Sequence, residues 1–300
     1  MKSHACCYFA VALLAAVGTA AGVRATAPPG TELVLNTRYF RTRPIDRQGY
    51  EAETFRLDPR KTAVVALHLW NIGAEGGPAV DSRFFVGMGI EATTREADRI
   101  VREIIKPAVD AARRAGILVC HVTHEWIGRR DPRAQKLADT AAQETSIAVS
   151  PGGEGRGYEA VPGWRKRIEE RAYGKDFLTK SPLARMSESG AIEILPGEPY
   201  VYQTGLLRDI LKERGIENII YTGFATDVCV LRADGGIEPM AAESYRVFLM
   251  RDATIGVEFQ DTFKERRSTG YAIRFFEVNF GNTLLSADFI KACPSGASRN

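Results

Sequence analysis

One cysteine, Cys229, stands where the chain should pass from a strand to a helix. The sequence leading to it is Tyr221-Thr-Gly-Phe-Ala-Thr-Asp-Val-Cys229. The apolar run before Gly223 is typical of a buried strand, and Thr226 and Asp227 are residue types that begin helices. A thiol in the first helical turn faces unpaired backbone N–H groups and the helix dipole, which both favour the nucleophilic thiolate. The same N–H groups could hold an oxyanion, so the pattern predicts acyl transfer.

The remaining cysteines are expected to be inert. Two lie in the first 27 residues, Cys120 lies inside an apolar run, and Cys293 lies in a tail rich in Pro, Gly and Ser. If the protein is exported, three thiols leave at least one unpaired. The alternative for Cys229 is a buried structural thiol, and the strand–turn–helix context favours the nucleophile.

His68 is the candidate base for this nucleophile. It ends an apolar run at 62–69, and a neutral imidazole there could accept the thiol proton and later protonate a leaving amine. Three carboxylates are candidates to orient the ring: Asp227, Glu198 and Glu258. The alternative is that His68 only fills a polar spot at a strand end.

Other polar and aromatic residues follow the predicted strands at the same edge of the sheet. In open α/β sheets, ligands bind beyond the carboxyl ends of the strands. We therefore expect a substrate to be bound there by Trp70, Asn71, His124, Trp126, Phe224, Thr226 and Asp227.

A metal site is the second chemistry to consider, with His68, His121 and His124 as ligands. His121 and His124 are an odd number of positions apart, so on a strand their side chains face opposite ways. The chain has no HExxH and no paired CxxC, and also no Walker A or GxGxxG motif. We expect no metal and no cofactor.

Strand-like and helix-like stretches alternate along the chain, which is the pattern of an α/β protein with a mostly parallel sheet. A helix over 91–115 is expected to bend at Pro107. The predicted strands are 62–69, 117–123, 200–202, 219–223 and 245–250, and the other predicted helices are 206–214 and 262–279.

The first 27 residues resemble a secretory signal: Lys2 precedes an apolar run at 9–22, and small residues precede Pro28. We expect a periplasmic or secreted protein, and the alternative is an uncleaved N-terminal anchor. Residues 28–300 are interpreted as one domain. The irregular stretch 128–198 is either a lid or oligomer contact, or a surface excursion.

Charge gives no reason to expect nucleic acid as a partner. The chain carries a formal net charge of +3, and residues 28–300 carry +1 because Lys2 and Arg24 lie in the first 27. No other stretch is long and apolar enough to span a membrane. A small-molecule substrate is the expected partner.

The segment Ile219-Ile-Tyr-Thr-Gly-Phe-Ala-Thr-Asp-Val-Cys-Val-Leu231 resembles the isochorismatase-like cysteine hydrolases, a superfamily that includes nicotinamidases and N-carbamoyl amide hydrolases. The resemblance spans most of 60–290. It implies a Rossmann-like three-layer α/β/α sandwich, an assembly of several copies, and an Asp–Lys–Cys triad with a covalent acyl-enzyme. It also implies a cis Phe224–Ala225 peptide and an oxyanion hole made by the N–H groups of Ala225 and Cys229.

Two triad positions depart from the family pattern. His68 stands where the aspartate is expected, and Pro199-Tyr-Val-Tyr-Gln-Thr-Gly205 contains no lysine; Lys175 and Lys180 are near in sequence only. The first hypothesis is an exported cysteine hydrolase that cleaves a non-peptide C–N bond. The rival is a pseudoenzyme that binds a small molecule or a partner protein.

Overall fold

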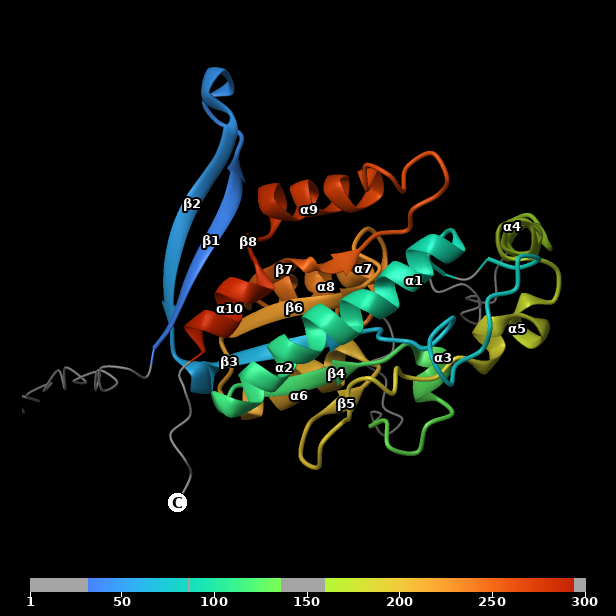
Figure 1. Ribbon diagram of the computed structural model, residues 1–300, viewed down its shortest axis with the longest axis horizontal. Helices are drawn as coiled ribbons and strands as arrows, with labels where there is room; N and C mark the ends of the chain where they lie inside the picture. The colour runs from blue at the N-terminus through green and yellow to red at the C-terminus, as the bar shows by residue number, and fades with distance from the viewer. Residues whose placement is uncertain (1–31, 86, 136–159, 294–300) are drawn as a thin grey trace, which may run out of the picture.

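An eight-stranded sheet forms the centre of the computed structural model, which describes residues 32–85, 87–135 and 160–293 (Figure 1). The strand order is β2-β1-β8-β7-β6-β3-β4-β5; strands β3 to β8 run parallel to one another, and β1 pairs antiparallel with both β2 and β8. The strands are β1 (Leu33–Arg41), β2 (Gly49–Leu57), β3 (Thr62–Leu67), β4 (Leu118–Val122), β5 (Tyr200–Val201), β6 (Asn218–Phe224), β7 (Arg246–Ile255) and β8 (Asn282–Leu284).

Helices cover both faces of the sheet. On one face lie α1 (Glu91–Ile100), α2 (Lys106–Arg114) and α10 (Ser286–Ala292), with a π-helical turn, Val101–Ile105, joining the first two. On the other face lie α6 (Thr204–Glu213), α7 (Cys229–Arg232), α8 (Ile237–Ala242) and α9 (Arg267–Asn279). Short 3-10 turns are Ile45–Arg47, Pro59–Lys61 and Pro182–Arg185. The predicted three-layer α/β/α architecture is confirmed.

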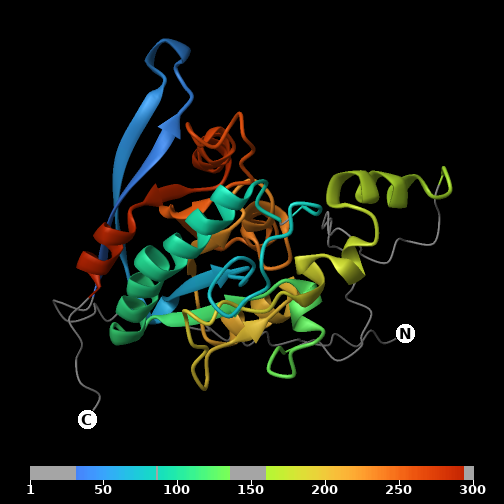
Figure 2. The same ribbon diagram turned by 45° about the vertical axis from the view of Figure 1, so that its right-hand side comes forward.

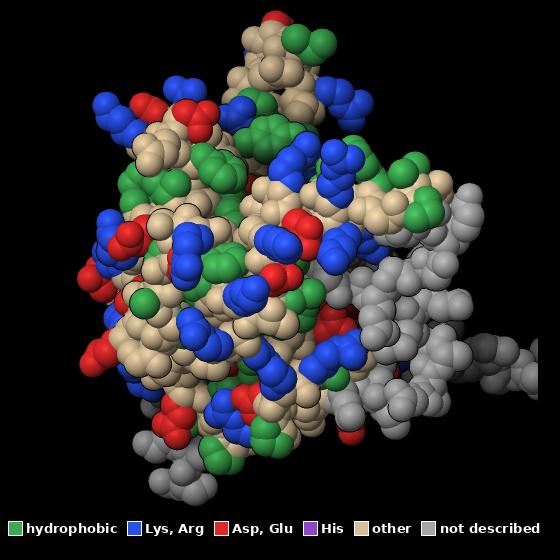
Figure 3. All heavy atoms as spheres, turned by 90° about the vertical axis from the view of Figure 1, so that its right-hand side faces the viewer, with side chains coloured by type: hydrophobic (Ala, Val, Ile, Leu, Met, Phe, Trp, Pro, Cys, Tyr) green, Lys and Arg blue, Asp and Glu red, His purple; other side chains and the backbone are tan. Residues whose placement is uncertain are grey.

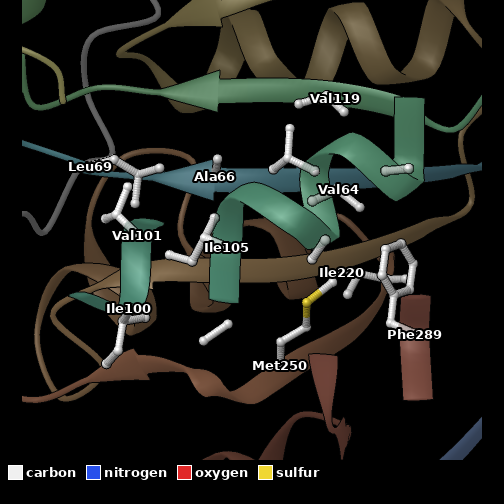
Figure 4. Packing of buried hydrophobic residues seen from close by; sticks show 14 of the residues in the cluster. Val64, Ala66, Leu69, Ile100, Val101, Ile105, Val119, Ile220, Met250 and Phe289 are labelled. Atoms are coloured by element: carbon white, nitrogen blue, oxygen red, sulfur yellow. The ribbon is translucent and has the colours of Figure 1, made fainter. Parts of the chain in front are cut away.

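The core lies between the sheet and these two layers. Every residue of β3 and of β6 is buried, as expected for parallel strands covered on both sides. Side chains alternate across β3, so that Val64 and Ala66 pack under the α1–α2 helix while Val65 faces α6 and α8. Figure 4 shows Val64 and Ala66 with Ile105 of the π-helical turn and Ile220 of β6. Burial of a valine or isoleucine side chain such as Val64 or Ile220 stabilises the fold by about 1.5–3 kcal/mol.

The stretch expected to be irregular contains short helices in its described part. These are α4 (Trp164–Tyr173) and α5 (Phe177–Lys180), and α4 buries none of its residues; another short helix, α3 (Glu125–Gly128), ends where the stretch begins. Figure 2 shows α4 and α5 standing away from the sheet. Residues 136–159 and the proposed N-terminal signal lie outside the described residues. Within the described residues, no helix is long and apolar enough to cross a membrane.

The hairpin of β1 and β2 was not predicted, and neither were β8 and α10. The hairpin joins the sheet edge through β8 and projects beyond the body of the molecule (Figure 1). The last long helix begins at Arg267 rather than at Thr262, because residues 260–266 form turns. The bend expected at Pro107 is preceded by the π-helical turn, in which the Lys106 N–H bonds to the Val101 carbonyl.

Candidate active site

Strands β3 and β6 lie side by side and deliver the predicted catalytic residues to one edge of the sheet. Leu67, the last residue of β3, pairs with Gly223 of β6. Gly223 has a φ of +118°, and a Cβ there would lie 1.9 Å from the Leu67 carbonyl oxygen. Only glycine allows this approach. His68 and the turn that carries Cys229 therefore leave the sheet from adjacent positions.

The turn after β6 is built around Ala225. The Phe224–Ala225 peptide is cis, which confirms that expectation from the resemblance. The Ala225 carbonyl accepts hydrogen bonds from Val228 N–H (3.2 Å) and Val230 N–H (3.0 Å). A backbone hydrogen bond from Ala225 reaches the Cys229 sulfur, and no carbonyl in the described part of the chain accepts from the Cys229 N–H. Both predicted oxyanion donors thus flank the thiol.

The Cys229 thiol is neutral rather than ionised, which corrects the expectation of a lowered pKa. Burial raises its pKa to about 11, and the Asp227 carboxylate adds to the rise, while the Ala225 hydrogen bond opposes it. Helix α7 is one turn long, so few peptide dipoles align behind the sulfur. Among the described residues, no lysine or arginine lowers the pKa. Lys180 is paired with Asp176, 2.7 Å away.

His68 is buried, with 4% of its surface exposed, and adopts a left-handed backbone with a φ of +54°. This conformation costs about 1–3 kcal/mol in a residue other than glycine and occurs at functional sites. Burial, and next the neighbouring His124, hold the pKa of His68 well below its usual value, while a hydrogen bond to the Thr123 backbone opposes them. Its Nδ1 has no partner among the described residues. No hydrogen bond in that part joins the ring to Cys229.

None of the three carboxylates proposed to orient His68 does so. Glu198 accepts from His121 Nε2 at 2.8 Å and from Arg113. Asp227 Oδ1 accepts from the Val257 N–H at 2.9 Å. The Glu258 carboxylate accepts from the N–H groups of Ser268 and Thr269 at the start of α9. Each carboxylate therefore stabilises a loop or a helix end.

Three predicted substrate contacts are also engaged elsewhere. Asn71 donates to the Ser187 hydroxyl at 2.8 Å and accepts from the Ser187 N–H at 2.9 Å, so its amide joins two segments of the chain. The Thr226 hydroxyl is fully buried against Thr254, 2.6 Å away. Phe224 is 2% exposed and packs in the core under α1. These contacts bury the Thr226 and Phe224 side chains and fix the orientation of the Asn71 amide, which keeps a second N–H.

Aromatic rings extend from His68 toward the inserted helices. His124 lies 5.2 Å from His68 and 4.8 Å from Trp126, and its Nδ1 accepts the Trp126 N–H. Burial lowers the pKa of His124 to about 4, so it is neutral. Trp126 approaches Phe177 of α5, which stacks on Tyr173 of α4 at 5.0 Å.

Tyr173 was missed by the sequence reasoning. Burial raises its pKa, and the nearby Cys229 sulfur adds to the rise. Trp70 lies 6.3 Å from His68 and packs against this aromatic set.

Glu188 is a second residue that the sequence did not single out. Its Oε1 is buried without a partner in the described part of the chain, and burial raises the pKa of the carboxyl to about 8. An antiparallel bridge between Glu188 and Trp70, which follows β3, brings it to the site. No local pattern signals it.

Within the described ranges, no group of three or more His, Cys, Asp and Glu side chains is arranged to hold a metal ion. A surface cavity of about 400 Å³ lies at α4, lined by Trp164, Arg167, Ile168 and Arg171. It contains none of the predicted site residues. The side of the molecule that carries the ends of the parallel strands shows basic and acidic side chains intermixed (Figure 3).

Known proteins with similar sequences are ureidoacrylate amidohydrolases. The enzyme RutB of Agrobacterium fabrum is 26% identical over 221 residues, which cover 69% of this chain and 82% of that protein. RutB of Acinetobacter baylyi is 29% identical over 185 residues, covering 60% of this chain and 66% of that protein. The chain is related to the isochorismatase-like cysteine hydrolases.

This relationship is distant. No family model matches the chain. Among solved structures, a cysteine hydrolase from Pseudomonas syringae pv. phaseolicola aligns with a TM-score of 0.48 and 16% identity, covering 80% of this chain and 95% of that one. The triad that the resemblance implies is not complete in this chain: His68 stands at the position of the aspartate, and no lysine in the described residues affects the Cys229 thiol.

Proposed function

We propose that the protein hydrolyses a non-peptide C–N bond, in an amide or a carbamoyl group, with Cys229 as nucleophile. The sulfur attacks the carbonyl carbon and the thiol proton passes to His68. The N–H groups of Ala225 and Cys229 hold the oxyanion. The imidazolium then protonates the departing nitrogen, the C–N bond breaks, and water releases the acid from the acyl-enzyme. The observation that carries this proposal is the pair of backbone donors flanking the Cys229 sulfur.

The raised pKa of the thiol and the lowered pKa of His68 both oppose proton transfer from the thiol to the ring before attack, so in this proposal the proton moves only as the sulfur attacks the carbonyl. At neutral pH both groups are uncharged at rest, so no thiolate–imidazolium pair exists beforehand. The ring interacts with the Thr123 backbone and leaves Nδ1 without a partner among the described residues, so Nδ1 is the acceptor in this proposal. Catalytic hydrogen bonds often tighten only when substrate binds.

Substitution of the nucleophile tests this function. The wild-type protein is assayed for ammonia release from ureidoacrylate, the substrate named in its relatives, and from simple amides. Cys229→Ala is expected to abolish turnover and leave the circular dichroism spectrum unchanged. Cys120→Ala is the matched control, because Cys120 is a fully buried thiol in β4. Hydrolysis at the wild-type rate in Cys229→Ala would refute the assignment.

A second candidate function is a pseudoenzyme that binds a small molecule or a partner protein without turnover. Two observations favour it: the thiol is neutral, and no hydrogen bond joins it to His68 among the described residues. A p-nitrophenyl ester separates the candidates. An enzyme acylates Cys229 and then releases acid repeatedly, whereas a pseudoenzyme shows at most one slow acylation per molecule by mass spectrometry.

We propose further that the protein is exported and self-associates. The apolar run at 9–22, after Lys2, supports export to the periplasm or the medium. Fractionation of cells that express the full chain tests this: a protein of about 33 kDa that stays in the cytoplasm counts against export. Light scattering measures the mass of the particle in solution, and the mass of a single chain at all concentrations counts against self-association.

A further inference from the structure

Two buried polar atoms without a hydrogen-bond partner in the described part of the chain, His68 Nδ1 and Glu188 Oε1, belong to residues that share one neighbour, Thr123. The Thr123 backbone hydrogen-bonds to the His68 ring, and the Thr123 hydroxyl interacts with the Glu188 carboxyl and with Tyr200. Buried polar groups are almost always paired, so two unpaired atoms beside one residue require an explanation.

The backbone fixes Glu188 at this place. Glu188 forms an antiparallel bridge with Trp70, two residues after His68. The flanking Ser189 N–H donates to the Leu69 carbonyl at 2.6 Å, and the flanking Ser187 is held by Asn71 on both its backbone and its side chain. The carboxyl is therefore attached to the end of β3 rather than carried by a free loop.

The charges that face Glu188 come from the segment after α3. They are Asp131 and Arg133, which pair with each other at 2.6 Å, so Glu188 has no cation of its own among the described residues. The Tyr200 hydroxyl interacts with the Glu188 carboxyl and with the Thr123 side chain. Among the described residues, the titratable group that acts on His68 is the neutral His124. A buried carboxyl in such surroundings is favoured as the neutral acid.

We propose that Glu188 is a positioning residue for His68: its carboxyl shares one buried polar site with the Thr123 hydroxyl and the His68 ring, and its charge controls how readily the ring takes up a proton. As the neutral acid, Glu188 leaves the ring uncharged. As a carboxylate, it stabilises the imidazolium and makes His68 a stronger base. The base role itself rests on the proposed function, but the coupling of the two groups does not.

The coupling is measured in the resting protein by nuclear magnetic resonance. The chain has four histidines, so ¹⁵N labelling gives few ring signals, and His68→Gln identifies the one to follow. In the wild type, the His68 signals are expected to shift with an inflection near pH 8, where Glu188 ionises. In Glu188→Gln that inflection is expected to be absent. Glu193→Gln, an exposed glutamate five residues later, is the matched control and should leave the curve unchanged.

Identical His68 curves in the wild type and Glu188→Gln would overturn the proposal. If Glu188→Gln fails to fold, the ¹³C carboxyl signal of Glu188 in the wild type decides instead, and an ordinary carboxylate titration near pH 4.5 would equally overturn it. Neither measurement needs a substrate, so a failure to find any hydrolysed amide leaves this test intact. Glu188→Asp, which restores a titrating carboxyl, should restore an inflection.

Discussion

The molecule contains two histidine–glutamate neighbourhoods that use the same residue types in opposite ways. His121 and Glu198 form a hydrogen bond of 2.8 Å, and Arg113 donates to the same carboxylate. Burial opposes the ionised form of Glu198, but hydrogen bonds from His121, Arg113 and the Leu195 N–H lower its pKa to about 2. Glu188, near His68, interacts with the Thr123 hydroxyl but accepts no hydrogen bond from a charged side chain in the described part of the chain, and burial raises its pKa to about 8.

This difference separates a structural pair from a candidate functional one. Around Glu198 the charge is paired. Its carboxylate binds Arg113 of α2, His121 of β4 and the Leu195 N–H, and so connects these two elements to the segment before β5. At His68 and Glu188 one polar atom of each side chain has no partner among the described residues, and both groups are neutral at pH 7. Neutral, poorly solvated groups are the ones that gain or lose protons during a reaction at neutral pH.

The largest contrast is expected in the histidines. His68→Gln should lower kcat/KM by about 10²–10⁴-fold, the usual contribution of a general base. His121→Gln should leave kcat/KM within a few-fold, because its partner Glu198 lies outside the reaction. It should instead lower the free energy of unfolding by about 1–3 kcal/mol through the lost hydrogen bond. Steady-state kinetics and urea unfolding on both variants check this. Equal losses of activity would mean that the two histidines do not differ in their role in the reaction.

The next effect concerns the two glutamates. Glu198→Ala leaves Arg113 and His121 buried without their partner, so the free energy of unfolding should fall by about 3–5 kcal/mol. Glu188→Ala removes a neutral carboxyl that has an unpartnered oxygen, so a much smaller loss is expected. Urea denaturation compares the two. A larger loss in Glu188→Ala would mean that Glu188 is the structural residue.

The smallest effect is a slope with pH, and the two glutamates give it opposite signs. The folded-state pKa of Glu198 is lowered, so its contribution to stability is present above the unfolded pKa near 4.5 and is lost as pH falls toward 2. The folded-state pKa of Glu188 is raised, so its contribution is present below pH 4.5 and is lost as pH rises toward 8. Each slope is at most about 1.4 kcal/mol per pH unit.

Glutamine variants isolate these slopes. Glu198→Gln should flatten the unfolding free energy below pH 4.5, and Glu188→Gln should flatten it between pH 4.5 and 8. The comparison uses slopes rather than absolute stabilities, because each substitution also changes a hydrogen bond. A Glu188→Gln curve parallel to the wild type from pH 5 to 8 would contradict the raised pKa.

The parallel sheet could be predicted from the sequence because each of its central strands is a short, largely apolar run of residues. The run ending at Leu67 and the run ending at Gly223 are continuously apolar, and both became fully buried strands. The β1–β2 hairpin was not recognised from the sequence, because its strands contain no continuous apolar run. In β1 only Leu33, Leu35 and Thr37 face inward, and they alternate with exposed residues.

Site positions were more predictable than side-chain partners. The location of Cys229 followed from a strand, a turn and a helix that are adjacent in sequence. The partner of Asn71 is Ser187, 116 residues away, and nothing local to either residue signals the pair. The same holds for Glu188, which reaches the site only because its backbone pairs with Trp70.

The protonated state of Cys229 has a consequence for oxidation of the sulfur. With a pKa of about 11, only about one thiol in ten thousand is ionised at pH 7. The thiolate is the form that reacts with peroxides and electrophiles, so the resting sulfur is shielded from sulfenic and sulfonic acid formation even though it forms no disulfide with a described residue.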